Sequence, residues 1–165
     1  TMELVLVSPV KPFWIILSKL IPYLFLSLIN FVSVLLLAHY VMEVPIRGSL
    51  TLLSFSALVF VGSSLGLGLL VSVISKTQQT AMLLCGMGLT MPTMLLSGII
   101  FPCESMPMAL QVLSDVIPAK WFIIIVKKIM IQGVGLQEIA KELTVLSGMA
   151  VFLLWVSVKN FKTRL

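Results

Sequence analysis

Long uncharged stretches alternate with short charged ones along this chain. Three uncharged runs have 23, 28 and 27 residues and cover 20–42, 48–75 and 77–103. A fourth run, 143–158, has 16 residues, and flanking lysines can extend it by snorkelling. About 20 apolar residues cross a bilayer, and backbone groups in lipid must pair within their own segment, so the runs predict four transmembrane helices. We expect these spans at 21–42, 49–75, 78–102 and 142–159.

The stretch between the third and fourth runs is apolar but too short and too charged to cross. Residues 121–132 contain Lys127 and Lys128 side by side, and a lysine at the bilayer centre costs about 2.5–3.5 kcal/mol. Pro118 and Gly133 bound the segment. We therefore expect a short re-entrant or interfacial helix there, a second short helix between the prolines at 107 and 118, and an outer loop over 104–141.

The composition agrees with this pattern. Hydrophobic residues make up 59% of the 165 residues, and charged residues only 10%. Soluble domains carry about 25% charged residues, and disordered chains combine low hydrophobicity with high charge, so both classes are excluded. The predicted fold class is an all-α integral membrane protein with four transmembrane helices and short helices in an outer loop.

The placement of the charges predicts the orientation. With four spans, both termini share one side, which holds six Lys or Arg residues against five on the other. Three of the six follow the last span directly, in a basic tail at 160–165 and at Lys159. Because positive residues near span ends favour the cytoplasm, we expect both termini there. The bases are scattered between apolar runs, which indicates the anionic lipid bilayer as their partner and no nucleic acid.

Candidate catalytic chemistry is sparse. The chain has one histidine and two cysteines, Cys85 and Cys103, whose spacing suits neither a disulfide within one helix nor a metal site. We expect no metal, no cofactor and no enzymatic activity of the chain's own. None of the four expected spans holds an Asp, Glu, Lys or Arg in its interior, so an ion-coupled transport pathway is not expected.

A few residues within the expected spans suggest packing or a transport path. Gly62 and Gly66 form a small-xxx-small pair, which favours close helix packing, with a substrate-lining groove as the alternative. Asn30 should hydrogen-bond to a neighbouring helix or line a pore. Pro92 should kink or loosen the third span, as a hinge or as a static bend.

Several stretches, in order along the chain, resemble the type-2 ABC transporter permeases, the membrane subunits of ATP-driven exporters. The opening TMELVLVSPVKPFWIILSKLIPY resembles the segment that leads into a span of that family. The later stretches SSLGLGLLVSVISKTQQTAML, MLLSGIIFPCESMPMALQVLSDVIPAKWFI and KKIMIQGVG are similar to it as well. The resemblance continues to the basic end KNFKTRL.

The resemblance implies that the chain is the C-terminal part of a permease in the bacterial inner membrane, working by alternating access. Residues 1–20 would be the cytoplasmic segment coupled to an ATP-binding cassette ATPase, with Glu3, Pro9 and Lys11 in it. The outer loop would hold two short re-entrant helices that cap the exit. Its gate residues would be Gly98, Pro102, Glu104 and Pro118. A second permease half would complete the pair, and the transported substrate cannot be read.

Two other functions remain as alternatives. A stand-alone homo-oligomeric channel, or a purely structural membrane protein, would need a polar face along one span, and the hydroxyl residues of 49–75 are the only candidates. A membrane-embedded enzyme would need paired acids or a histidine cluster at membrane depth, which the sequence lacks.

Overall fold

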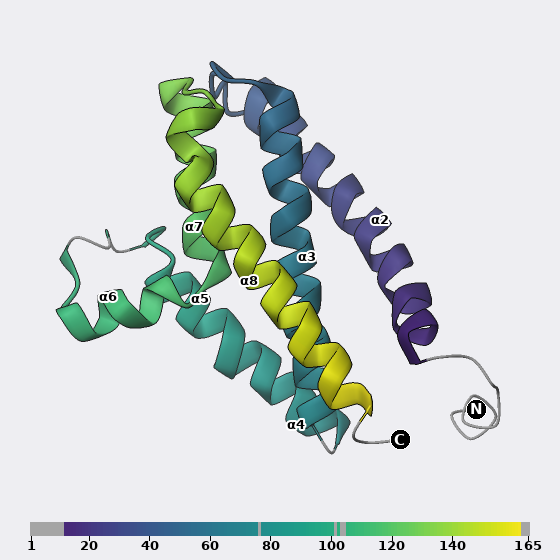
Figure 1. The fold of residues 1–165 in the computed structure, drawn as a ribbon. Helices are drawn as coiled ribbons and strands as arrows, with labels where there is room; N and C mark the ends of the chain where they lie inside the picture. Colours follow the sequence, from purple (N-terminus) through teal and green to yellow (C-terminus); the bar gives the residue numbers. More distant parts are fainter. Residues whose placement is uncertain (1–11, 76, 101, 103–104, 163–165) are drawn as a thin grey trace.

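The computed structural model describes residues 12–75, 77–100, 102 and 105–162, and it is helical throughout its ordered elements (Figure 1). Its long helices are α2 (Pro12–Tyr40), α3 (Leu50–Ile74) and α8 (Leu136–Lys162). Between α3 and α8 the chain forms shorter pieces. These are α4 (Gln78–Leu83), the π-helix η1 (Leu84–Thr90), α5 (Met91–Leu96), α6 (Met108–Asp115), α7 (Pro118–Lys127) and the π-helix η3 (Lys128–Gln132).

Four helical stretches are long and apolar enough to cross a membrane, which confirms the predicted fold class. They are Leu20–Tyr40, Leu50–Ile74, Gln78–Leu96 and Leu136–Asn160. The third combines α4, η1 and α5. The pieces α6 and α7–η3 are also apolar, but the chain bends by 87° between them, as a re-entrant loop or a broken span does. The chain is a multi-pass, all-α membrane protein.

The helices differ in their bounds from the expected spans at three places. The first helix begins at Pro12, where proline suits the first helical turn. The third stretch ends at Leu96, before Gly98 with its left-handed φ of 84°. The last helix begins at Leu136 and carries Glu138, Lys141 and Glu142 inside its first two turns. A boundary drawn at the last charge therefore places its start six residues late.

The buried core lies where α3, α7, η3 and α8 meet. Leu53 of α3, Ile125 of α7, Ile129 of η3, and Ile139 and Leu146 of α8 are all 0% exposed. Phe60 of α3 and Phe122 of α7 stack beside them, with ring centroids 4.4 Å apart. In Figure 1, α7 runs from the bend toward the end of the molecule at which α8 begins, and it lies alongside α3 and α8. The re-entrant piece is thus part of the core.

The helices α3 and α8 approach each other closely at Gly66. A Cβ on Gly66 would lie 3.1 Å from the Cβ of Leu153 and 3.3 Å from the backbone nitrogen of Leu154. Next to this contact, the Ser157 hydroxyl donates a buried hydrogen bond of 2.8 Å to the Gly66 carbonyl. The absent side chain at Gly66 is what lets the two backbones come this close.

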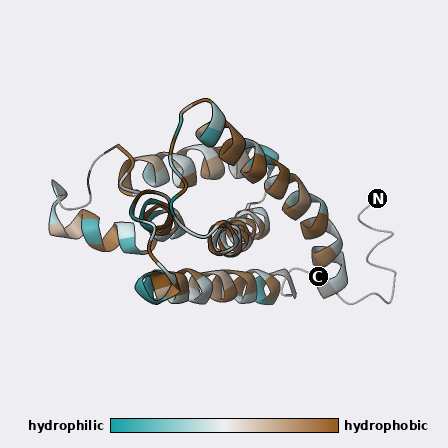
Figure 2. Cartoon of the chain, turned by 90° about the horizontal axis from the view of Figure 1, so that it is seen from above, coloured by the Kyte–Doolittle hydropathy of each residue, from teal (hydrophilic) through white to brown (hydrophobic). Residues whose placement is uncertain are grey.

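The outer surface of the described helices is largely apolar. Figure 2 shows hydrophobic residues on the outward as well as the inward sides of the long helices. The candidate spans Leu20–Tyr40 and Gln78–Leu96 contain no buried residue in their most apolar windows, whereas α3 and α8 do. This is the surface expected of helices that face lipid or another membrane protein, since such surfaces are not stable in water.

Candidate functional site

The third candidate span is interrupted by a π-helical segment of seven residues, η1. The Met91 amide bonds to the carbonyl of Gly86, five residues back, and the Thr90 hydroxyl donates 2.8 Å to the carbonyl of Cys85. Pro92 follows at the start of α5 and has no amide hydrogen to continue a regular ladder. The irregularity that Pro92 predicts is present, in the form of this wide turn, and π-turns of this kind are common at functional sites.

The chain then turns sharply toward α6. Ser97 donates its amide to the Thr93 carbonyl as the last helical bond, and Gly98 adopts a φ of 84°, which favours glycine. Further on, the Pro102 carbonyl accepts bonds from both the amide (3.0 Å) and the hydroxyl (2.8 Å) of Ser105. Gly98 and Pro102 therefore shape the connection between the third span and the bent pair.

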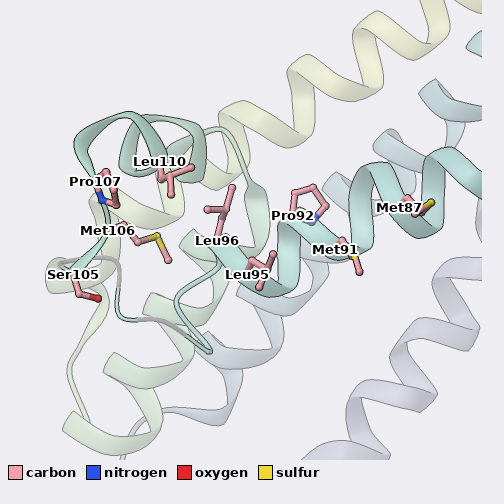
Figure 3. A pocket seen from close by; sticks show the side chains of 9 residues that line it. All are labelled: Met87, Met91, Pro92, Leu95, Leu96, Ser105, Met106, Pro107 and Leu110. Atoms are coloured by element: carbon pink, nitrogen blue, oxygen red, sulfur yellow. The ribbon is translucent and has the colours of Figure 1, made fainter.

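An apolar groove of about 640 Å³ lies between this helix and the start of α6 (Figure 3). Met87, Met91, Pro92, Leu95 and Leu96 supply one wall. Ser105, Met106, Pro107 and Leu110 supply the other. Figure 3 shows the two sets projecting from separate segments toward the same space. Methionine side chains are flexible and fit apolar groups of different shape.

The groove can hold apolar groups. None of its described lining residues is ionisable, and among them Ser105 provides the only side-chain hydroxyl, which already donates to Pro102. Among the described residues there is no group of three His, Cys, Asp or Glu side chains that could hold a metal ion. Cys85 is exposed with a free thiol, and Cys103 lies outside the described residues.

The bend between α6 and α7 is held by side chains that reach across it. Lys120 donates 2.6 Å to the Asp115 carboxylate and 2.8 Å to the hydroxyl of Ser114, which is fully buried. The Trp121 indole donates 2.9 Å to the Asp115 carbonyl. Pro118, the first residue of α7, is buried directly after the turn. The bend is thus fixed by specific contacts.

At the far end of α7, the two adjacent lysines differ. Lys127 is exposed, whereas Lys128 lies against α8 and donates 2.8 Å to the carboxylate of Glu142 and 3.1 Å to the Glu138 carbonyl. Glu142 is 9% exposed. The expected absence of charges inside the spans therefore needs correction, because the last candidate span carries a largely buried acid that a lysine from the neighbouring helix compensates.

The residues proposed from sequence are distributed over several places. Pro92 lines the groove, Gly98 and Pro102 form the turn beside it, and Pro118 starts α7. The coupling residues and one gate residue lie outside the described residues; these are Glu3, Pro9, Lys11 and Glu104.

Two of the residues proposed for packing or a transport path lack a close helix contact in the described part of the chain. Asn30 is exposed on α2, and within the described part of the chain its side chain makes no hydrogen bond to a neighbouring helix. Gly62 is half-buried with open space around its Cβ position, so of the small-xxx-small pair only Gly66 makes the close contact. The buried small residues on this face of α3 are instead Ser56, Ser63 and Gly66.

Sequence reasoning missed the pair Lys128–Glu142 and the bond from Ser157 to Gly66. The first joins residues 14 positions apart and the second joins residues 91 positions apart, so no local spacing in the sequence reveals them. One signal was available for the first pair. Two lysines on an apolar helix need compensation, and the next acids along the chain, Glu138 and Glu142, stand at the start of the following helix.

Comparison with known proteins places these features in a family context. The family model described as "ABC-2 family transporter protein" matches residues 1–159. The chain is 35% identical over 133 residues to the probable multidrug ABC transporter permease YbhS of Escherichia coli, covering 81% of this chain and 35% of the relative. It is 33% identical over 143 residues to the probable multidrug ABC transporter permease YbhR, covering 87% and 39% respectively.

A eukaryotic relative is similar too, namely ABC transporter G family member 20 of Dictyostelium discoideum. It is 32% identical over 148 residues, which is 87% of this chain and 20% of the relative. The chain thus spans little more than a third of the length of the bacterial relatives. No solved structure matches significantly.

Proposed function

The chain belongs to the ABC-2 family of transporter proteins, and we propose that it forms the C-terminal part of the membrane permease of an ATP-driven exporter. In this role it carries no catalytic residues, and a separate ATP-binding cassette subunit hydrolyses ATP. The permeases named among its relatives support this reading.

The single observation that carries the proposal is the bent pair α6–α7 beside the third span. The bend of 87° keeps both pieces from crossing as one straight helix, and the apolar groove opens between α5 and α6. The packed end of α7–η3 lies at the start of α8, opposite the end of the molecule that holds the C-terminus (Figure 1). The start of α2, which follows the proposed coupling segment in the sequence, lies toward the other end (Figure 1), and this separation suits alternating access.

The proposed mechanism follows from that separation. ATP closes a pair of nucleotide-binding subunits, which push on the cytoplasmic segment around Glu3, Pro9 and Lys11. The spans then rock, and the re-entrant pair, with Gly98, Pro102, Glu104 and Pro118 in or beside it, opens and closes the outer exit. A second permease half covers the exposed faces of α2 and of the third span, which have no buried residue among those described in their most apolar windows.

The substrate class follows from the groove's chemistry. Its wall is made of methionine, leucine and proline side chains with one hydroxyl, so it favours an apolar or amphipathic substrate over a charged one. Two relatives are described as probable multidrug permeases, which agrees with such a substrate. Both termini are proposed to lie in the cytoplasm of a bacterial cell.

The test is reconstitution of the full-length protein with its ATPase subunit in liposomes. We expect an amphipathic fluorescent dye to move in the export direction only when ATP is present. A variant of the ATPase subunit that binds but cannot hydrolyse ATP is the control, and it should not sustain transport. If instead the protein conducts ions without the ATPase and without ATP, the channel alternative holds and the exporter proposal is wrong.

A further inference from the structure

The outer end of the re-entrant helix is joined to the last span by one ion pair. The Lys128 ammonium, at the start of η3, lies 2.8 Å from a Glu142 carboxylate oxygen and 3.1 Å from the Glu138 carbonyl, both in α8. Its side chain is 29% exposed and that of Glu142 is 12% exposed. Both charges are thus largely withdrawn from solvent.

The carboxylate of Glu142 is bonded by Lys128, and the neighbouring Lys141 adds a weaker Coulombic attraction. Its oxygen Oε1 accepts from Lys128, while Oε2 is buried and has no hydrogen-bond partner among the described residues. Breaking a largely buried pair by removing one partner is strongly unfavourable, because the other charge stays without compensation. If Lys128 moved away from α8, the largely buried Glu142 carboxylate would lose the ammonium group that compensates its charge. The pair therefore resists separation of η3 from α8.

The segment that precedes α3 also holds η3 in place. The Arg47 amide donates 3.3 Å to the Met130 carbonyl, which ties the segment before α3 to η3. Gly48 lies so close to Ile129 that a Cβ there would be 2.5 Å from the Ile129 carbonyl oxygen. The outer ends of α3, η3 and α8 therefore form one fastened unit.

The preceding piece of the hairpin is not fastened in this way. Most residues of α6 are exposed, including Met108, Val112 and Leu113, and only Ser114 at its end is buried. The turn to α7 lies at residues 116–117, next to the buried Pro118. The piece α6 is joined to α7 across the 87° bend by the bonds from Lys120 to Ser114 and Asp115, so it can move relative to α7 only if these bonds break.

We propose that Lys128 and Glu142 are positioning residues that lock this end of α7–η3 to α8, so that these helices move as one body. The role of this lock in transport rests on the proposed exporter function. The rigid connection itself does not.

The first experiment measures the connection directly. Spin labels are attached at Lys127→Cys on α7 and Gln137→Cys on α8, both exposed positions, in a cysteine-free background of the full-length complex. We expect one narrow distance distribution that stays unchanged between nucleotide-free and ATP-bound states. Glu142→Gln or Lys128→Gln, each added to the labelled protein, should broaden it.

The second experiment measures transport and ATP hydrolysis in the same unlabelled variants. We expect a loss of ATP-driven dye transport of at least roughly tenfold in Glu142→Gln and Lys128→Gln. Breaking a largely buried pair by removing one partner costs more free energy than a tenfold change in an equilibrium constant represents. Basal ATP hydrolysis should be retained. Glu138→Gln and Lys127→Gln are matched controls on the same helices, since both side chains are exposed, and they should behave like the wild type.

A further variant keeps the test informative if a single substitution prevents folding. Lys128→Gln combined with Glu142→Gln removes both charges and leaves neither unpaired, so it should fold while the distance distribution still broadens. The charge swap Lys128→Glu with Glu142→Lys should restore much of the narrow distribution.

The proposal is overturned if the wild-type distance changes between nucleotide states, or if the pair variants match their controls in both distance and transport. If the wild-type complex shows no ATP-driven transport at all, the proposed function fails. The distance measurement then still decides whether the lock exists.

Discussion

Single glycines decide how closely the helices of this protein approach. Gly66 packs directly against Leu153 and Leu154 of α8, whereas Gly62, one turn earlier on α3, has open space at its Cβ position. The difference is invisible in the sequence, where the two form one equivalent pair. Which member faces the neighbour depends on the crossing point of α3 and α8, and residues far apart in the chain set that point.

Replacing the two glycines in turn tests this difference. Gly66→Leu should force α8 outward and break the bond from Ser157, which costs about 1–3 kcal/mol for an overpacked contact. The measurement is the thermal unfolding midpoint of the purified protein in detergent. Gly62→Leu is the matched control and should leave the midpoint nearly unchanged. An equal loss in both variants would show that the close contact is not at Gly66.

Charged residues show the same limit of sequence reasoning at the residue scale. The pair Lys127–Lys128 predicts that the segment does not cross as one span of its own, because two lysines oppose insertion. It does not predict that one lysine faces outward and the other binds Glu142. That distinction needs the register of α7 against α8. The uncharged run likewise places the start of the last span at 142, whereas the helix begins at Leu136 and so includes Glu142, which pairs with Lys128.

At the scale of elements, the third candidate span contains a π-helical segment that is followed directly by a proline, Pro92. Pro22 lies inside α2 without interrupting that helix, so a proline alone does not produce the irregularity. In the third span, Gly86 and Gly88 and the Thr90 hydroxyl accompany Pro92. Sequence reasoning therefore locates the irregularity but not its kind.

Substitution of Pro92 tests whether it maintains the wide turn. Pro92→Ala restores an amide hydrogen, so a regular α-helical bond can form and the helix should straighten toward the groove. Spin labels at Met82→Cys and Met108→Cys, which are both well exposed, report this as a shifted distance. Pro22→Ala serves as the control and should not shift it. An unchanged distance in Pro92→Ala would show that Gly86, Gly88 and Thr90 maintain the π-helical segment without the proline.

The bend between α6 and α7 gives a second prediction for an element. Lys120→Met removes the donor to Asp115 and to buried Ser114, and it should destabilise the bend by about 1–2 kcal/mol, most of it from the buried hydroxyl because Asp115 is 53% exposed. Amide hydrogen exchange of the peptide covering 112–122 should then rise about 5–30-fold. Lys127→Met, on the same helix but exposed, should leave exchange in that peptide unchanged.

At the scale of the whole molecule, the number of candidate spans and the helical class could be predicted from uncharged runs alone. The reason is physical, since lipid demands internal pairing of every backbone group and tolerates few charges. The arrangement of the spans could not be predicted. Nearly all helix surfaces are apolar, so hydrophobicity does not distinguish the side of α3 that packs on α8 from the side that faces lipid. The groove beside Pro92 likewise arises only when α6 folds back on α5.

The orientation of the molecule is a prediction that labelling can decide. In a cysteine-free background, Gln137→Cys at the start of α8 should react with a membrane-impermeant maleimide in intact cells. Asn160→Cys near the end of that helix should react only after the cells are permeabilised, because the basic residues that follow favour the cytoplasm. Labelling in the reverse order would place both termini outside.

The unequal lengths of the candidate spans affect the membrane itself. The apolar helix α3 has 25 residues, or about 37 Å, while the third stretch has 19 residues, or about 28 Å at most, against a hydrocarbon core of about 30 Å. In Figure 1 the third stretch also lies at an angle to α3. Any lipid that borders the third stretch is therefore expected to thin, while lipid beside α3 is expected to thicken or that helix to tilt. Lipids with shorter acyl chains are expected to gather wherever the second permease half leaves the third stretch open to the bilayer.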